Sequence, residues 1–205
     1  MKKITAFFYL ILLFVCANCQ NSPTKESQVQ AGEDTLKTEA EQDGRPAKSL
    51  INPKGMTIET RILVPDGYER VPLPDSSYCA YLRQLPLKPD GAMVMFYDGS
   101  PKTGDNIYCA VIDKPIGEKD LHQCADAIMR LRAEYFYERS EYDKIHFDFT
   151  NGMRVDYTEW MKGKRMRVKG SKSYWYPATK PSKSHETFWE YLEIIFSYAG
   201  TLSLS

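Results

Sequence analysis

The chain has 205 residues, of which 42% are apolar, and its 27 Lys and Arg are balanced by 27 Asp and Glu. This balance gives no reason to expect a polyanionic partner such as nucleic acid. No Walker loop, paired-cysteine zinc pattern, H-E-x-x-H or G-x-S-x-G motif is present, so the sequence predicts neither a metal site nor a cofactor.

The chain opens with a segment of the secretory type. Two lysines precede an apolar run, 4–15, which is too short to span a bilayer and is typical of a signal peptide. Residues 15–17 fit cleavage by a signal peptidase, whereas Cys19 could be lipidated. The residues before Cys19 depart from the usual lipobox, but the polar stretch beyond it favours a lipoprotein. We therefore expect residues 1–19 to be the signal peptide and Cys19 to be the lipid anchor.

Residues 20–50 are polar and nearly free of large apolar side chains, so they cannot bury enough surface to fold. We expect a disordered tether here, between the membrane and a single α+β domain over 51–205. The protein is thus expected to be exported and membrane-anchored in the cell envelope, with no nucleic-acid partner. In an oxidising periplasm the thiols of Cys79, Cys109 and Cys124 allow at most one internal disulfide, and the sequence leaves its pairing open.

The first half of this domain is expected to contain short strands and one short helix. Residues 57–64 indicate a strand that ends at a Pro-Asp-Gly turn, and Ser77 is placed to cap a helix over 78–85. The apolar runs 92–97 and 107–112 flank a turn-rich loop and are expected to pair as neighbouring strands.

The longest stretch without Gly or Pro after the leader, 120–137, predicts the main helix, with Asp120 as its cap. Its apolar residues fall at helical spacing and define the expected inner face: Leu121, Cys124, Ala125, Ile128, Leu131 and Tyr135. Arg132 lies close to the centre of this face. A buried guanidinium needs a carboxylate, so we expect a structural ion pair at Arg132 unless its head reaches solvent.

The stretch 145–157 predicts a β-hairpin. A two-residue Asn-Gly loop would mix apolar and charged residues on one face, whereas a three-residue loop, 150–152, keeps one face apolar with Gly152 in the left-handed region. This register pairs Phe149 with Met153, Phe147 with Val155 and Ile145 with Tyr157. It leaves Asp148 opposite Arg154 and His146 opposite Asp156 on the other face.

A last helix is expected over 185–199, with Ser184 as its cap and Gly200 as its stop. Its expected inner face is Phe188, Tyr191, Leu192, Ile195 and Ala199. Together the elements indicate an α+β fold, in which an antiparallel sheet is packed by the two main helices.

Cys124 is the catalytic candidate, because a Cys followed by His146 and Asp156 resembles the papain-like order of nucleophile, base and orienting group. The main helix would climb about 20 Å at ~1.5 Å per residue, which places the hairpin tip rather than His146 beside Cys124. His122 shares the helix but projects from a different face. A helix N-terminus favours a thiolate, yet a Cys on an apolar stripe is more often a core residue. We expect an enclosed thiol with no histidine nitrogen beside it.

Two further features have a structural and a binding interpretation. The basic run 162–172 could meet phosphate or acidic glycan, although a solvated strand and turn explains it better. The tryptophans Trp160, Trp175 and Trp189 could line a glycan cleft, although such residues are more often part of a core or its rim.

Six segments carry a resemblance to a known family: TRILVPDGYERVP, YLRQLPLKPDG, the YDG at 97–99, DLHQCADAIMRLRAEY, FDFTNG and YAGTLSL. They resemble a family of exported proteins and lipoproteins of Bacteroidetes, catalogued as domain of unknown function 4846. The match runs from about Thr57 to the C-terminus, and the Cys-Ala-Asp-Ala helix motif is its most specific part. The family has no established activity.

Family members continue past YAGTLSL into a strand with a Gly-His-Ala motif that resembles the His strand of papain-like amidases. The resemblance implies an incomplete papain-like or amidase-like core, with Cys124 as nucleophile and its histidine beyond residue 205. Two hypotheses follow. The chain is a cell-envelope lipoprotein related to Cys hydrolases of peptidoglycan or peptides but catalytically incomplete, or it is a non-enzymatic periplasmic lipoprotein that binds a glycan or a protein.

Overall fold

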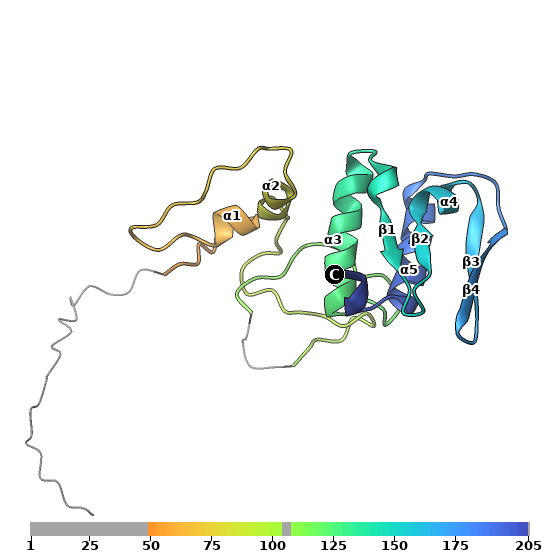
Figure 1. Cartoon of the computed structure of the whole chain (residues 1–205). Helices are drawn as coiled ribbons and strands as arrows, with labels where there is room; N and C mark the ends of the chain where they lie inside the picture. The colour runs from red at the N-terminus through yellow and green to blue at the C-terminus, as the bar shows by residue number, and fades with distance from the viewer. Residues whose placement is uncertain (1–48, 104–107, 205) are drawn as a thin grey trace, which may run out of the picture. The chain divides into compact units, whose positions relative to one another are not determined.

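Helix α5 (His185–Tyr198) supplies the centre of the core (Figure 1). The computed structural model describes residues 49–103 and 108–204, which belong to one compact unit, 46–205. The predicted inner face of α5 is confirmed, since four of its residues are 0% exposed: Phe188, Tyr191, Leu192 and Ile195. Ser184 caps the first turn by accepting a hydrogen bond from the Thr187 backbone N–H at 3.3 Å.

The described residues combine helices with two small antiparallel sheets, which confirms the α+β class. The predicted signal peptide and Cys19 lie outside the described residues, as does the predicted tether up to residue 48. Within the described ranges, no helix has the length and apolarity that a membrane span needs.

The hairpin of β1 (His146–Asp148) and β2 (Arg154–Asp156) has the predicted register. His146 lies opposite Asp156, Phe147 opposite Val155 and Asp148 opposite Arg154. Gly152 has a φ of 81° and donates its backbone N–H to the Phe149 carbonyl at 2.8 Å, which closes the three-residue loop. The buried apolar pair in the middle of the hairpin sets this register, because a slip by one residue would expose it.

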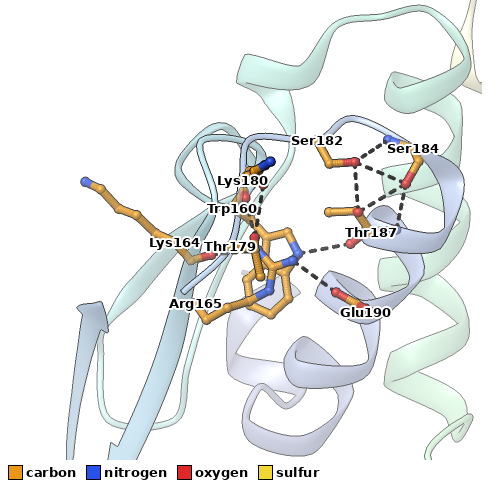
Figure 2. Close-up of polar contacts among 9 residues, drawn as sticks. All are labelled: Trp160, Lys164, Arg165, Thr179, Lys180, Ser182, Ser184, Thr187 and Glu190. Carbon is orange, nitrogen blue, oxygen red and sulfur yellow. Dashed lines mark hydrogen bonds and ion pairs between the residues drawn. The ribbon is translucent and has the colours of Figure 1, made fainter. Parts of the chain in front are cut away.

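A second hairpin follows the short helix α4 (Tyr157–Met161) and is formed by β3 (Lys164–Lys169) and β4 (Lys172–Pro177). Figure 2 shows how its base is tied to α5. The Arg165 guanidinium stacks 4.2 Å from the Trp160 ring centroid and pairs with Glu190 at 3.1 Å. The expected sheet combined the hairpin at 145–157 with strands at 92–97 and 107–112, whereas the structure has two separate two-stranded antiparallel sheets, one for each hairpin.

The face that helix α3 (Cys124–Glu138) turns to the core agrees with the predicted one only in part, since Ala125 packs against the core. Met129 is 0% exposed, whereas Ile128 from the expected inner face is 53% exposed. Part of the expected apolar stripe packs on another helix instead, since the Tyr135 ring lies 5.2 Å from that of Tyr78. The rest of the prediction failed because the true inner face carries charged residues, which hydrophobic periodicity assigns to solvent.

The start of α3 also differs from the prediction. The helix begins three residues later than expected, at the residue after Gln123, whose backbone N–H donates to the Asp126 carboxylate at 2.9 Å. Asp126 rather than Asp120 therefore supplies the carboxylate that satisfies a free N–H at this end.

The predicted strand at 57–64 is wrong, because α1 (Ile58–Arg61) occupies its first half. Thr57 accepts the Thr60 backbone N–H at 3.3 Å and starts this helix. Arg61 is 0% exposed, and its guanidinium donates to the Gly55 and Lys88 carbonyls and to Asp90 at 2.8, 3.1 and 3.0 Å. Helix α2 (Tyr78–Arg83) agrees with the prediction, with Ser77 as its cap.

The predicted strand pair is replaced by turns and isolated bridges in the described part of 92–112. Asp98 accepts the backbone N–H and the hydroxyl of Ser100 at 2.9 and 2.6 Å, which makes a tight turn. This turn brings Met95 into a bridge with Pro101, and Ile112 forms a bridge with Leu87 instead. Two 3-10 turns complete the fold: η1 (Tyr142–Lys144) and η2 (Thr201–Leu204).

A substitution at Gly163, which lies between α4 and β3, tests whether the close approach of the Thr179 carbonyl restricts this position. Its φ is 88°, and a Cβ there would lie 2.1 Å from the Thr179 carbonyl oxygen, whereas Gly67 has a φ of 83° and open space. We expect Gly67→Ala to cost about 1–2 kcal/mol from backbone strain alone. Gly163→Ala should cost about 2–5 kcal/mol, because overpacking adds to the strain. Urea unfolding measures both, and equal losses would show that Thr179 does not restrict Gly163.

Candidate functional site

Cys124 is the first residue of α3 and is exposed, so the expectation of an enclosed thiol is wrong. It lines a pocket of about 460 Å³, which we call the Cys124 pocket, together with residues from two segments, 94–102 and 116–123. Three exposed side chains of the first segment give it an apolar wall: Met95, Phe96 and Tyr97. The thiol is therefore accessible to a ligand in this pocket.

His122 lines the same pocket, although it was expected to project away from Cys124. That expectation assumed that the helix began at Asp120. Because α3 begins at Cys124, His122 precedes the helix and its side chain does not follow helical geometry. Its ring packs edge-on against Phe196, with 5.8 Å between ring centroids.

The imidazole of His122 is engaged by Arg130. The Nη1 atom of Arg130 lies 3.4 Å from the Nε2 atom of His122. A guanidinium can only donate, so this Nε2 must accept, and the proton of the neutral ring is on Nδ1. Burial lowers the pKa of His122, and the positive charge of Arg130 lowers it further. The ring is therefore neutral at physiological pH, but the lone pair on Nε2 already accepts the hydrogen bond from Arg130.

The residues of the papain-like order are not brought together. His146 lines a different pocket, of about 400 Å³, with Arg132 and Tyr78 among its neighbours. The Nδ1 atom of His146 is buried and has no hydrogen-bond partner in the described structure. Asp156 lies opposite His146 on β2, but its carboxylate accepts a hydrogen bond from Arg154 at 2.9 Å.

Arg132 lies on the exposed side of α3, with its guanidinium 5.1 Å from the Phe136 ring centroid. The expectation of a buried ion pair at Arg132 is thus not met, and the alternative, a head group in solvent, agrees with the structure. The buried arginine of this helix is Arg130, which is 4% exposed and pairs with Glu134 at 2.8 Å.

Glu134 is the centre of a buried ion cluster. Lys114 approaches its second carboxylate oxygen at 2.8 Å, and the Arg130 guanidinium also donates to the Pro115 carbonyl at 2.6 Å and lies 4.8 Å from the Trp189 ring centroid. Burial alone would raise the pKa of Glu134, but the hydrogen bonds from Lys114 and Arg130 outweigh it and lower the pKa. The cluster ties the segment that carries His122 to α3, so it positions one wall of the Cys124 pocket.

Sequence reasoning missed this cluster, although one local signal was available. Arg130 and Glu134 are spaced i, i+4 and can pair on any helix. Nothing in the sequence shows that the pair is buried, because burial depends on Lys114 and Trp189, which come from other parts of the chain.

The other thiols give no disulfide in the described residues, where Cys79, Cys109 and Cys124 are all free and exposed. Those residues also contain no group of three or more His, Cys, Asp or Glu side chains that could hold a metal ion.

Arg130→Ala and Arg132→Ala form a matched pair that tests the ion cluster. Removing Arg130 leaves a buried carboxylate short of a partner, so we expect a loss of about 3–5 kcal/mol. Removing the exposed Arg132 should cost less than about 1 kcal/mol. Thermal melts at neutral pH measure the difference, and similar losses would contradict the burial of Glu134.

The difference in stability between these two variants should depend on pH, and the direction of that dependence is fixed by the lowered pKa of Glu134. A carboxylate whose pKa is lowered by folding stabilises the protein above its ordinary pKa of 4.5, and this contribution is lost as the pH falls through the folded value. The gap in stability between the two variants should therefore narrow in acid.

Searches of curated proteins and of solved structures gave no match to this sequence. The model of one family, domain of unknown function 4846, matches residues 58–205. The matched range contains α3 with the Cys124 pocket, the ion cluster and both hairpins. The chain therefore belongs to the family described as domain of unknown function 4846.

Proposed function

We propose that this protein is a lipoprotein of the cell envelope whose Cys124 pocket binds a peptide ligand without cleaving it. One observation carries the second half of this proposal. The pocket exposes a thiol and an apolar wall, but the Nε2 lone pair of His122, which general-base catalysis would need, accepts from Arg130.

Anchoring in the membrane is supported by the sequence of the leader. The apolar run 4–15, a cysteine at position 19 and the long polar segment beyond it are typical of a lipoprotein, although residues 16–18 depart from the usual lipobox. A lipid on Cys19 would keep the folded unit on the exported side of a membrane, within reach of the cell wall. The family origin in Bacteroidetes, inferred from the resemblance, agrees with such a location.

A peptide fits the Cys124 pocket by its chemistry. Phe96 and Tyr97 are 48% and 44% exposed and offer apolar surface for a side chain. Lys102 lines the same pocket and can attract a carboxylate. An apolar wall beside a cation suits a short peptide with a free carboxyl group, such as those of peptidoglycan. A cell-wall glycan is the second candidate, because the same two rings could stack on a sugar.

An evolutionary relationship to Cys hydrolases is compatible with this proposal. Cys124 lies at the positive end of a helix of 15 residues, which is where papain-like enzymes place their nucleophile. Among the described residues that line the pocket, the thiol is retained and the histidine is engaged by Arg130. We therefore propose a catalytically incomplete, ligand-binding form.

The lipid anchor is tested by fractionating cells that express the whole chain. Cys19→Ser should move the protein from the membrane fraction to the soluble fraction, because the acylated sulfur is lost. Cys16→Ser, which changes the neighbouring cysteine, should leave the protein in the membrane fraction. Mass spectrometry of the mature protein should find an acylated Cys19 at its N-terminus. A free N-terminus at Asn18 or Gln20 would refute the anchor.

The binding function is tested by sedimentation with purified peptidoglycan, either intact or stripped of its peptides by an amidase. We expect binding to the intact polymer only, weakened about tenfold or more by Phe96→Ala with Tyr97→Ala, because both rings contact the ligand. Tyr68→Ala with Met56→Ala removes two exposed side chains outside the pocket and should change nothing.

Three other outcomes are informative in the same assay. Binding to the stripped polymer would favour the glycan, and no binding to either would refute a cell-wall ligand. Release of soluble fragments that Cys124→Ser abolishes would show that the pocket does catalyse hydrolysis, and the non-cleaving half of the proposal would then be wrong.

A further inference from the structure

Although the chain as a whole has no formal net charge, one of its segments is strongly basic. Residues 162–183 contain eight of the 27 Lys and Arg and no Asp or Glu. The remainder of the chain therefore carries an excess of acidic residues. The second hairpin, β3 and β4, is built from this segment.

The pairing of β3 and β4 sorts these residues between two faces. Met166 is 7% exposed and belongs to the core, and Val168 and Trp175 pack against it from the same face. The opposite face pairs Arg165 with Tyr176, Arg167 with Tyr174, and Lys169 with Lys172. We call its outer part, formed by Arg167, Lys169, Lys172, Tyr174 and Tyr176, the basic face.

The charges at the base of the hairpin have partners that explain them. Lys162 and Lys164 both pair with Glu159. Figure 2 shows the pair of Arg165 with Glu190 on α5. These contacts hold the hairpin to the rest of the fold. No function beyond stability is needed to account for them.

The charges of the basic face have no such partners. Across residues 49–103 and 108–204, no carboxylate lies within ion-pair distance of Arg167, Lys169 or Lys172. Lys169 and Lys172 also lie directly opposite each other, and like charges in that position destabilise a strand pair. Stacking on Tyr176 accounts for Arg167, but the fold gains nothing from the opposed Lys169 and Lys172, and their charges favour an anionic partner.

We propose that the basic face docks on the anionic headgroups of a lipid bilayer. Lysine and arginine clusters bind phosphate-bearing headgroups, and tyrosines favour the interface between water and lipid. Tyr174 is 42% exposed beside these cations. Arg167 lies 4.5 Å from the Tyr176 ring centroid and covers that ring, which is therefore not free to stack on a sugar. The bilayer thus explains the face better than an acidic glycan does.

This docking rests on the proposed lipid anchor, which would raise the concentration of the domain near the membrane surface. The tether predicted from the composition of residues 20–50 would have a root-mean-square reach of roughly 30 Å, so an anchored domain would meet the membrane surface often. The basic face would then fix which side of the domain faces the bilayer. The lipid would retain the protein, and the hairpin would orient it.

The test uses the whole chain with Cys19→Ser, which has no acyl group, and sedimentation with vesicles. Vesicles of phosphatidylcholine with phosphatidylglycerol should bind the protein, whereas pure phosphatidylcholine should not. Arg167→Gln, Lys169→Gln and Lys172→Gln together should weaken binding on the order of a hundredfold. Raising the salt concentration should also weaken it, because the contacts are screened.

A matched control removes the same number and kind of charges elsewhere. Lys54→Gln, Lys144→Gln and Arg132→Gln change three exposed cations outside the hairpin and should alter binding less than about threefold. Melting curves of both triple variants should match that of the parent, which shows that the fold is intact.

Three results would overturn the docking. They are equal binding to both kinds of vesicle, equal loss in both triple variants, or binding to a soluble polyanion such as dextran sulfate without binding to vesicles. Because the protein in this assay has no acyl group, each result bears on the basic face alone. The fractionation experiment on Cys19 decides the anchor separately.

Discussion

A buried carboxylate places the strongest constraint on this structure. Glu134 is 6% exposed, and a carboxylate removed from water is very costly unless cations and hydrogen bonds replace its hydration. Arg130 supplies one partner from the same helix, and Lys114 supplies the other from the segment before it. Helix α3 must therefore turn its charged edge inward. That requirement leaves Ile128 in solvent and prevents the most apolar stripe of the helix from becoming its core face.

The same constraint shapes the chemistry of the Cys124 pocket. Arg130 reaches beyond Glu134 to the Pro115 carbonyl and to His122, so it fixes the segment that forms one side of the pocket. This contact brings an imidazole and the Cys124 thiol to one pocket. It also occupies the nitrogen through which that imidazole could accept a proton. The interaction that stabilises the fold is thus also the one on which the proposed binding function rests.

The positive charges of the second hairpin fall into two groups, one that the fold neutralises and one that it does not. At its base, Arg165 is stacked on Trp160 and paired with Glu190, so its charge is compensated and contributes to packing. Toward the turn, Lys169 and Lys172 oppose each other without compensation. A local excess of one sign that the fold does not neutralise is available to a partner, even though the chain as a whole is balanced.

Local physics in the sequence determined α5 and the first hairpin. Helix α5 has a single apolar face, and the three-residue loop that ends at Gly152 keeps Phe147 and Val155 on one side of the hairpin. Tertiary structure alone decided the inner face of α3, the helix that ends in the buried Arg61, and the turns that replaced the strands at 92–112. The inner face of α3 and the burial of Arg61 depend on polar partners far away in the chain, and Ile112 pairs with the distant Leu87. Hydrophobic periodicity cannot detect a charge that is buried because a distant residue neutralises it.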